Sequence, residues 1–317
     1  MSLTFNHQTN DISNATGTVT FNGTAVGGDN TPPVWFGSRG VFGGGSRATS
    51  TNTMEYITIA NTGNTTDFGD LTTARSVIAS NCSNGSRGVF AGGGEQNTID
   101  YITIANTGNA TDFGNLTVAR GYMGGCANGI RGVFGGGFDL NTIDYITIDT
   151  TGNAVDFGNL RAATFAIGAL ASNTRGLFAG GVADGSEIQY ITIGTPGNAT
   201  DFGNLTVSTT YITGVSNATR GIFAGGAGTP TLNVIQYVTI DTTGNATDFG
   251  DLTVDRKGMG GCSSGVRGVF GGGSRTVNYS DSKTNVIDYI TINTLGNATD
   301  FGDLSSDTAD LAACAGD

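Results

Sequence analysis

One sequence motif is repeated six times along this chain, and this repetition constrains the fold more than any other feature of the sequence. Each copy contains Arg-Gly-hydrophobic-Phe-(Gly/Ala)-Gly, then Tyr-(Ile/Val)-Thr-Ile, then Asp-Phe-Gly. The period is 44 to 52 residues, and each copy consists of short strand-like runs separated by glycine turns. Such a period, built from strands, is typical of a propeller or a similar array and not of six separate domains. The sequence therefore predicts a single all-β ring.

Distances between the repeated residues show which part of the copy varies in length. The repeated arginines, tyrosines and aspartates are Arg39, Arg87, Arg131, Arg175, Arg220, Arg267, Tyr56, Tyr101, Tyr145, Tyr190, Tyr237, Tyr289, Asp67, Asp112, Asp156, Asp201, Asp248 and Asp300. Each Tyr precedes its Asp by 11 residues and each Asp precedes the next Arg by 19 or 20, but the distance from Arg to Tyr ranges from 14 to 22. Length variation is therefore confined to the connection between the second and third strands.

The second copy illustrates the four strands that we expect in each blade. Residues 76–82 carry small side chains, as the crowded axis of a propeller requires of its innermost strand. Residues 87–93 form the second strand. Residues 99–104 are rich in β-branched and aromatic side chains and form the third strand, and residues 111–116 form the outer one.

The ends of the chain predict how the ring closes. The first copy begins at its second strand with Arg39, and residues 309–317 match a first strand that has no copy of its own. If the C-terminal strand completes the first blade, no sheet edge is left free there. We therefore expect a leader at residues 1–33, with a strand and turn at 17–26. Residues 34–317 are predicted to form a six-bladed β-propeller with four strands per blade and velcro closure by the C-terminal strand.

Charge and hydropathy argue against two classes of partner. The chain has 14 basic and 26 acidic residues, and its basic residues gather in no stripe, so the counterion release that drives nucleic-acid binding is missing. No apolar run approaches the ~18 residues of a membrane span, and residues 1–10 lack the pattern of a secretory signal. We expect synthesis in a cytosol, no binding of nucleic acid and no membrane insertion.

The sequence holds little material for catalysis. Its single histidine, His7, lies outside the copies, so no histidine-based metal site or catalytic triad can form in the ring. Cys82, Cys126 and Cys262 each lie five residues before a repeated Arg, hence on equivalent strands, and we expect them to be buried and unpaired. Recurrent Asn-x-Thr triplets, such as the one at Asn109, are interpreted as turns. No catalytic residue, metal ion or cofactor is predicted.

The six repeated arginines and six repeated aspartates are interpreted as a structural ring. A functional site needs to be made only once, whereas these residues return in every copy. The arginines begin the second strand on the ring face where the fourth strand begins with the aspartate. We therefore expect a girdle of Arg–Asp contacts within or between blades, with turn capping as the alternative role of the aspartates.

The connection between the second and third strands is the predicted binding surface, because loops on a rigid scaffold commonly carry recognition. The longest one spans residues 274–284. Its candidate binding residues are Arg275, Asn278, Tyr279, Asp281 and Lys283. The alternatives are tolerated variation in loop length and a contact within an assembly. The leader is a second candidate, which would dock the ring to another protein.

The copies resemble kelch repeats, in which a double glycine ends the second strand, a Tyr lies in the third and a Trp in the fourth. The corresponding residues here are the glycines at 92–93, Tyr101 and Phe113, with their counterparts in the other copies. Phe in place of Trp departs from the kelch pattern, and Trp35 is the only Trp in the chain. The resemblance covers residues 34–317 and implies a kelch-like propeller.

The amino-acid sequence of the copies is also similar to repeat arrays in virion structural and tail-fibre proteins of marine phages, especially those of cyanobacteria. It reads Arg-Gly-Val-Phe-Gly-Gly-Gly, Asn-Thr-Ile-Asp-Tyr-Ile-Thr-Ile and Gly-Asn-Ala-Thr-Asp-Phe-Gly. This resemblance implies a noncatalytic structural or adhesive protein of a virion, either a tail fibre or a capsid decoration. Its partners would be other virion proteins, through the leader, and a host surface glycan or protein. The alternatives are a carbohydrate-binding or carbohydrate-cleaving propeller and a cellular kelch-like interaction scaffold, because a fold alone does not confer function.

Overall fold

The computed structural model of the chain describes residues 36–217, 219–228, 230–277 and 280–317, apart from the side chains of 79–81 and 277, and four short strands of the leader. The chain divides into two units, Met1–Pro32 and Pro33–Asp317. In the first unit, β1 (Thr4–Asn6) pairs with β2 (Asp11–Ser13), and β3 (Thr20–Phe21) pairs with β4 (Thr24–Ala25). Among the described residues, no helix has the length and apolarity needed to cross a membrane.

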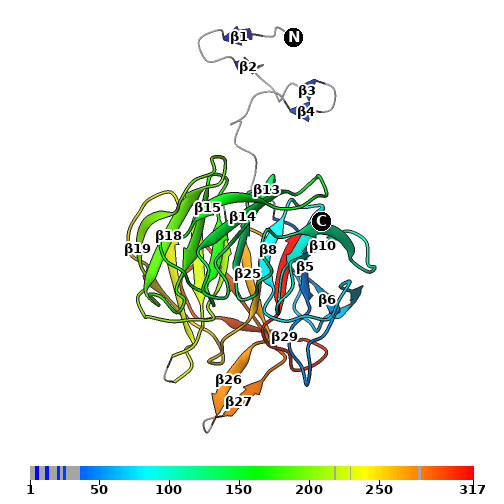
Figure 1. Ribbon diagram of the computed structural model, residues 1–317, viewed down its shortest axis with the longest axis vertical. Coiled ribbons are helices and arrows are strands. Elements are labelled where there is room, and N and C mark those ends of the chain that lie inside the picture. The colour runs from blue at the N-terminus through cyan, green and yellow to red at the C-terminus, as the bar shows by residue number, and fades with distance from the viewer. Residues whose placement is uncertain are drawn as a thin grey trace. The chain divides into compact units, whose positions relative to one another are not determined.

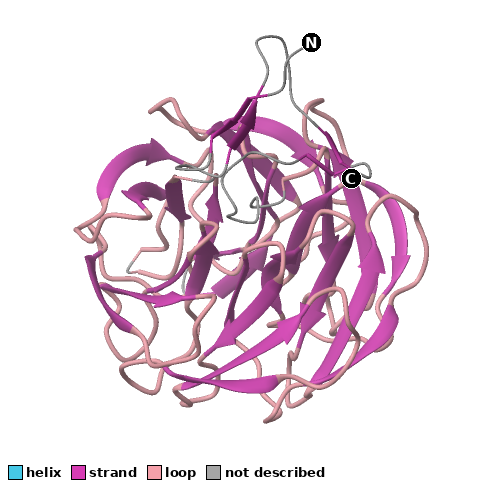
Figure 2. Ribbon diagram, turned by 90° about the horizontal axis from the view of Figure 1, so that it is seen from above, coloured by secondary structure: helices cyan, strands magenta, loops and turns pink. Residues whose placement is uncertain are grey.

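In the second unit, the described residues form six four-stranded antiparallel sheets, arranged as the blades of a propeller (Figures 1 and 2). The predicted all-β fold of six blades is therefore confirmed. From the axis outwards, the strands of blade 1 are β30 (Ala312–Gly316), β5 (Arg39–Gly43), β6 (Thr53–Thr58) and β7 (Thr66–Asp70). Those of blade 2 are β8 (Ala79–Ser83), β9 (Arg87–Ala91), β10 (Thr98–Thr103) and β11 (Thr111–Asn115). Those of blade 3 are β12 (Gly124–Ala127), β13 (Arg131–Gly135), β14 (Thr142–Thr147) and β15 (Val155–Asn159).

Blades 4 to 6 repeat this order. The strands of blade 4 are β16 (Gly168–Ala171), β17 (Arg175–Ala179), β18 (Glu187–Thr192) and β19 (Thr200–Asn204). Those of blade 5 are β20 (Thr213–Ser216), β21 (Arg220–Ala224), β22 (Val234–Thr239) and β23 (Thr247–Asp251). Those of blade 6 are β24 (Gly260–Ser263), β25 (Arg267–Gly271), β28 (Val286–Thr291) and β29 (Thr299–Asp303). The long connection of blade 6 forms an additional hairpin, β26 (Ser274–Val277) with β27 (Ser280–Lys283).

The C-terminal strand closes the ring as predicted. Strand β30 pairs with β5 along its whole length, from Ala312 opposite Gly43 to Gly316 opposite Arg39. The last residue adds a side-chain contact, because Asp317 Oδ1 accepts hydrogen bonds from the amide and the hydroxyl of Ser38, both at 2.6 Å. Blade 1 therefore joins the two ends of the propeller and leaves no innermost strand missing.

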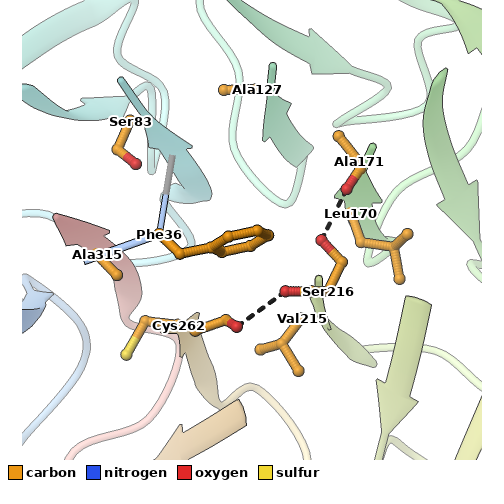
Figure 3. A pocket seen from close by; sticks show the side chains of 10 residues that line it. Phe36, Ser83, Ala127, Leu170, Ala171, Val215, Ser216, Cys262 and Ala315 are labelled. Carbon is orange, nitrogen blue, oxygen red and sulfur yellow. Dashed lines mark hydrogen bonds between the residues drawn. The ribbon is translucent and has the colours of Figure 1, made fainter. Parts of the chain in front are cut away.

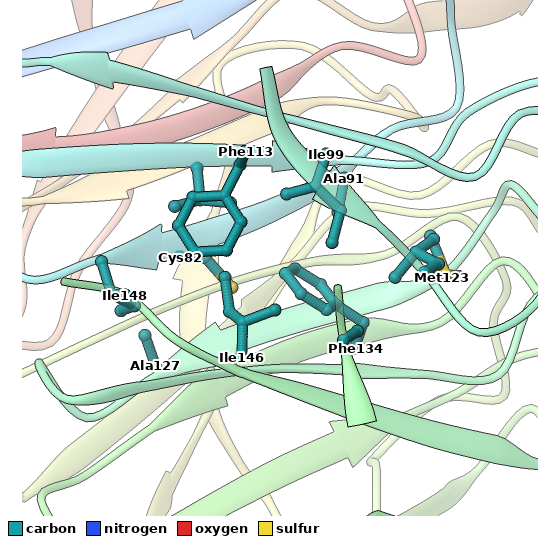
Figure 4. Close-up of a cluster of buried hydrophobic side chains, with 12 residues drawn as sticks. Cys82, Ala91, Ile99, Phe113, Met123, Ala127, Phe134, Ile146 and Ile148 are labelled. Carbon is teal, nitrogen blue, oxygen red and sulfur yellow. The ribbon is translucent and has the colours of Figure 1, made fainter. Parts of the chain in front are cut away.

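The hydrophobic core is divided among the interfaces between blades. In the cluster between blades 2 and 3, Cys82, Ile99 and Phe113 of blade 2 face Phe134 and Ile146 of blade 3 (Figure 4). Each of the other clusters of described residues likewise joins neighbouring blades. A single blade would leave half of each interface exposed to water, so the blades stabilise one another only within the ring.

The glycine that follows each repeated arginine is explained by this packing. A Cβ on Gly88 would lie 2.3 Å from Cys314 Sγ of the preceding blade, and one on Gly176 would lie 2.9 Å from Cys126 Sγ. The side chain of the innermost strand occupies the space that a Cβ would need. The four cysteines, Cys82, Cys126, Cys262 and Cys314, are buried and free, as predicted for the three that the repeat aligns.

The turn between the third and fourth strands of each blade binds the outer strand of the preceding blade. Gly108 and Ala110 donate their amides to the carbonyls of Phe68 and Asp70 at 2.7 and 2.8 Å, and Asn109 Oδ1 accepts from the Asp70 amide at 3.0 Å. The same contacts recur around the ring. They explain the constant distance of 11 residues from Tyr to Asp, and they cover an outer edge that could otherwise pair with another chain.

The repeated arginines bind an aromatic ring and a backbone carbonyl. Arg131 Cζ lies 4.6 Å from the centre of the Tyr145 ring in the same blade, and its Nη1 donates to the carbonyl of Ile193 in the next blade at 3.0 Å. The other five arginines make equivalent contacts. Each arginine therefore joins two blades through a cation–π contact and a charge-assisted hydrogen bond.

The predicted girdle between these arginines and the repeated aspartates is wrong. The aspartates are exposed, and in the part of the chain that the structure describes only Asp201 among them is in an ion pair, with Arg161, which is not a repeated arginine. The register shows why. Arg87 lies opposite the last residue of β10, whereas Asp112 lies opposite Asp100 near its beginning, and the third strand separates the two. The tyrosine ring occupies the place beside the guanidinium that the girdle would have required.

Buried ion pairs are present at another position of the repeat. Arg75–Asp100, Arg120–Asp144 and Arg256–Asp288 have N–O distances of 2.9, 3.0 and 2.6 Å, and all six side chains are fully buried. In each pair the carboxylate also binds the linker that enters the blade. Asp144, for example, accepts from the amide of Thr117 at 3.1 Å and from its hydroxyl at 2.6 Å.

The other blades replace both partners of this pair together. Blades 4 and 5 have Thr164 with Gln189 and Thr209 with Gln236, and each glutamine still accepts from the linker amide. In blade 1 the arginine position is Thr308 and the aspartate position is Glu55, which pairs at 2.8 Å with Arg47 from the connection between β5 and β6 of the same blade. The paired replacement follows from the cost of burying a single uncompensated charge.

Replacing Arg131 with Ala tests the contact between blades. We expect the free energy of unfolding to fall by about 1–2 kcal/mol, because one cation–π contact and one hydrogen bond to a charged donor are lost. The melting temperature should fall by a few degrees while the circular dichroism spectrum keeps its β-sheet form. Arg161→Ala is the control, because its ion pairs are exposed and should contribute little. Equal shifts in the two variants would contradict this account.

Exchanging one buried ion pair for its neutral counterpart tests the paired replacement. Asp144→Gln alone leaves Arg120 buried without its carboxylate, and we expect a loss of about 3–5 kcal/mol. Adding Arg120→Thr reproduces the combination of blades 4 and 5 and should restore more than half of that loss. Urea unfolding of the two variants gives the comparison. A double variant no more stable than Asp144→Gln would show that the pair is not a replaceable unit.

Candidate ligand site at one mouth of the central channel

A closed circle of six backbone hydrogen bonds surrounds the axis just before the innermost strands. One residue of each blade takes part and donates its amide to the carbonyl of its counterpart in the preceding blade, at 2.7–3.0 Å. The six residues are Val77, Tyr122, Ala166, Tyr211, Gly258 and Asp310. Together they line one end of the channel. We call this end the tyrosine mouth.

All six residues adopt the left-handed backbone conformation. Their φ angles lie between 55° and 65°, although only Gly258 is a glycine. For other residues this conformation costs about 1–2 kcal/mol, and for a β-branched residue such as Val77 it is a true outlier. The bend turns each amide sideways toward the next blade. It also delays the start of the strand, so β8 begins at Ala79 and not at Ser76, where the sequence had placed it.

The circle repeats in its backbone but not in its side chains, and four aromatic rings gather there. Tyr122 and Tyr211 come from blades 3 and 5, yet their ring centres are 5.6 Å apart and their planes are perpendicular. Phe138 and Phe165 lie 5.7 and 5.8 Å from the Tyr122 ring. These aromatics do not belong to the repeat, and both tyrosines remain partly exposed. The group is therefore made once in the ring, as a ligand site needs to be.

One carboxylate completes the tyrosine mouth. Asp310 lies over Gly258, where a Cβ would stand 2.5 Å from Asp310 Oδ1. Burial raises the pKa of Asp310, and the nearby Lys283 and Lys257 partly oppose this shift. Burial, with smaller effects of Tyr122 and Asp310, raises the pKa of Tyr211 to about 12. The tyrosines therefore keep their hydroxyl protons at neutral pH.

The tyrosine mouth opens into a small hollow of about 60 Å³, so a ligand larger than a few water molecules would rest mainly over the mouth and not inside it. The opposite end of the channel is different. There the ring of Phe36 lies among the last residues of the innermost strands, including Ser83, Ala127 and Ser216 (Figure 3). A ligand can therefore approach the axis from the side of the tyrosine mouth, whereas the other end already holds an aromatic side chain.

The predicted binding loop lies beside the tyrosine mouth, on the same face of the ring. Asp281 pairs with Lys257 at 2.9 Å, and Lys257 Nζ lies 5.9 Å from the centre of the Tyr211 ring. Lys283 donates to the hydroxyl of Ser46 at 2.8 Å and to the carbonyl of Arg47. These contacts fix the hairpin to blades 6 and 1.

The remaining predicted loop residues are less central to the tyrosine mouth. Arg275 pairs with Asp255 at 2.7 Å, at the root of the hairpin. Asn278 and Tyr279 lie outside the described residues. The sequence prediction thus selected the face of the ring that carries the hollow, but it selected the hairpin and not the residues around the axis.

Tyr122, Tyr211 and Asp310 were missed because no motif marks them. A signal was nevertheless present in the copies. Tyr122 and Tyr211 each precede the repeated Arg by nine residues, a position occupied by Ala166 and Gly258 in other copies. A position that is small in some copies and aromatic or acidic in others is free of the repeat's packing. That freedom is what a site made once would require.

In comparisons with known proteins, no family model and no curated protein matches this chain. Within the described residues, no three His, Cys, Asp or Glu side chains gather closely enough to hold a metal ion.

Asp310→Asn tests the electrostatics of the tyrosine mouth. Because the pKa of Asp310 is raised in the folded state, the stabilising contribution of its protonated form is present below the unfolded pKa of about 3.9 and is lost as the pH rises through the folded pKa. Asn also tolerates a positive φ. We therefore expect the variant to melt above the wild type at pH 7, with a difference that shrinks toward pH 4.

Asp184→Asn is the matched control. Hydrogen bonds from Ser186 lower the pKa of Asp184, so its contribution to stability is present above the unfolded pKa and is lost as the pH falls. This variant should melt below the wild type at pH 7, with a difference that also shrinks in acid. A difference for Asp310→Asn that does not change with pH would contradict the assigned ionisation.

Proposed function

We propose that the protein is a noncatalytic binding propeller that holds its ligand at the tyrosine mouth, and that it serves as a structural or adhesive protein of a phage particle. The observation that carries the binding role is the circle of six equivalent backbone positions with six unequal side chains. A purely structural role would require similar side chains at this position in all six blades. Instead, the side chains differ, and Tyr122, Tyr211 and Asp310 lie close together at the tyrosine mouth. The phage assignment rests on the similarity of the repeat sequence to repeat arrays in virion structural and tail-fibre proteins.

The face around the tyrosine mouth supports a role in adhesion. It carries the hairpin β26–β27 and three exposed valines, Val118, Val182 and Val207, on its connections. Exposed apolar residues such as Val155 and Val266 lie toward the opposite face as well, so it is the hairpin and the partly exposed tyrosine rings that distinguish this face and favour contact with another surface there. In this proposal the leader would attach the ring to neighbouring virion proteins, and the face around the tyrosine mouth would meet a glycan or protein on the host.

A carbohydrate-cleaving propeller is the second candidate, because two carboxylates near the tyrosine mouth have pKa values shifted in opposite directions. Burial raises that of Asp310, whereas the hydrogen bond from Lys257 lowers that of Asp281. Glycosidases divide the roles of acid and nucleophile or base between two such groups. Release of reducing ends from polysaccharide by the wild type, and not by Asp310→Asn, would favour this candidate over a binding protein.

Immunogold electron microscopy of particles purified from the native source tests the virion role. The antibody is raised against residues 274–284, and antibody absorbed with that peptide is the control. We expect gold on particles, at the tail tip for a host-adhesion protein and over the capsid for a decoration protein. Gold on no particle would overturn the virion role and favour a cellular interaction scaffold.

A further inference from the structure

The charges beside the tyrosine mouth restrict the kind of ligand that it can hold. Lys257 is paired with Asp281, and Lys283 is bound to Ser46 and to the carbonyl of Arg47. Among the described residues at the tyrosine mouth, the positive charges of Lys257 and Lys283 balance the negative charges of Asp281 and Asp310, so neither a phosphate nor an ammonium ligand meets an unbalanced charge there. Asp310, in turn, lies under the influence of both lysines. The positive charges of the two lysines oppose the binding of a cationic ligand to Asp310.

The aromatic side chains favour a ligand with both apolar and hydroxyl surfaces. Tyr122 and Tyr211 are partly exposed, pack against each other with perpendicular rings, and both line the hollow. An aromatic face gains free energy by covering C–H groups, and the phenol oxygens and the Asp310 carboxylate accept hydrogen bonds from hydroxyls. A sugar ring presents C–H groups on its face and hydroxyls around its edge.

We propose that the tyrosine mouth binds a neutral saccharide. A sugar ring would lie against Tyr122 and Tyr211 and donate a hydroxyl hydrogen bond to Asp310. This inference rests on the proposed function and names its ligand. Because Phe36 lies at the other end of the channel, the saccharide would enter from the face with the hairpin, as a chain end or a branch.

One small residue of the circle, Ala166, lines the hollow and leaves room for the ligand. Ala166 separates Tyr122 from Tyr211 along the chain of hydrogen bonds, and Gly258 lies between Tyr211 and Asp310. A larger side chain at position 166 would extend into the hollow, whereas the space over Gly258 is already taken by the Asp310 carboxylate. Ala166 also shows that alanine can occupy the circle at a φ of 58°, so an alanine at position 122 or 211 is compatible with the fold.

Four variants separate binding from folding. Tyr122→Ala and Tyr211→Ala each remove one ring and should weaken saccharide binding about tenfold, the effect expected for the loss of one stacked aromatic contact. Ala166→Phe adds a ring to the hollow and should abolish binding while both tyrosines remain. Val266→Ser is the control. Val266 is 65% exposed and precedes the second strand of blade 6, at the end of the channel that holds Phe36.

The experiment probes an array of immobilised neutral and charged oligosaccharides with the full chain, followed by titration calorimetry with the neutral oligosaccharide that binds best. We expect saturable binding that the three mouth variants weaken and Val266→Ser leaves unchanged. Melting curves confirm that each variant is folded. Binding to charged glycans alone, to no glycan, or equally by all variants would overturn the inference.

A second measurement distinguishes failure of this inference from failure of the proposed function. Fluorescently labelled protein is added to host cells that are untreated, oxidised with periodate or treated with protease. Loss of adhesion after periodate, and not after protease, supports a saccharide. Adhesion that survives periodate overturns the saccharide and leaves the adhesive role standing. No adhesion to untreated cells counts against the adhesive role itself.

Discussion

The circle of six backbone hydrogen bonds at the tyrosine mouth is the constraint on which the rest of the propeller depends. It fixes where each innermost strand begins, and it holds six residues in a left-handed conformation that five of them would ordinarily avoid. A hydrogen bond from each blade to the preceding one can form a closed circle only if the last blade meets the first. Strand β30 provides that closure by pairing with β5.

Contacts between blades continue outwards from this circle in layers. Next to the axis, side chains of the innermost strands pack on the glycines of the following blade. Farther out, each repeated arginine binds a tyrosine of its own blade and a carbonyl of the next one. At the rim, backbone hydrogen bonds from each turn reach the preceding outer strand. The repeated residues thus serve the interfaces between blades more than the blades themselves, which is why they cannot vary from copy to copy.

The candidate site uses what this framework leaves free. Side chains at the six positions of the circle differ in size and polarity, while the backbone conformation and its hydrogen bonds stay the same. Two tyrosines and one aspartate occupy three of these positions, and two further aromatics approach from the connections. The framework supplies rigid positions around an axis, and the unequal side chains supply the chemistry.

The sequence by itself determined the number of blades, the order of their strands, the closure by the C-terminal segment and the burial of the cysteines. These features follow from local periodicity and from the spacing of Arg, Tyr and Asp, which any closed ring of repeats must respect. The partners of the arginines depended on the register between strands, which placed a tyrosine and not an aspartate beside each guanidinium. The meeting of Tyr122, Tyr211 and Asp310 was likewise decided only by the tertiary structure, because closure of the ring brings together residues of blades 3, 5 and 1 that are far apart along the chain.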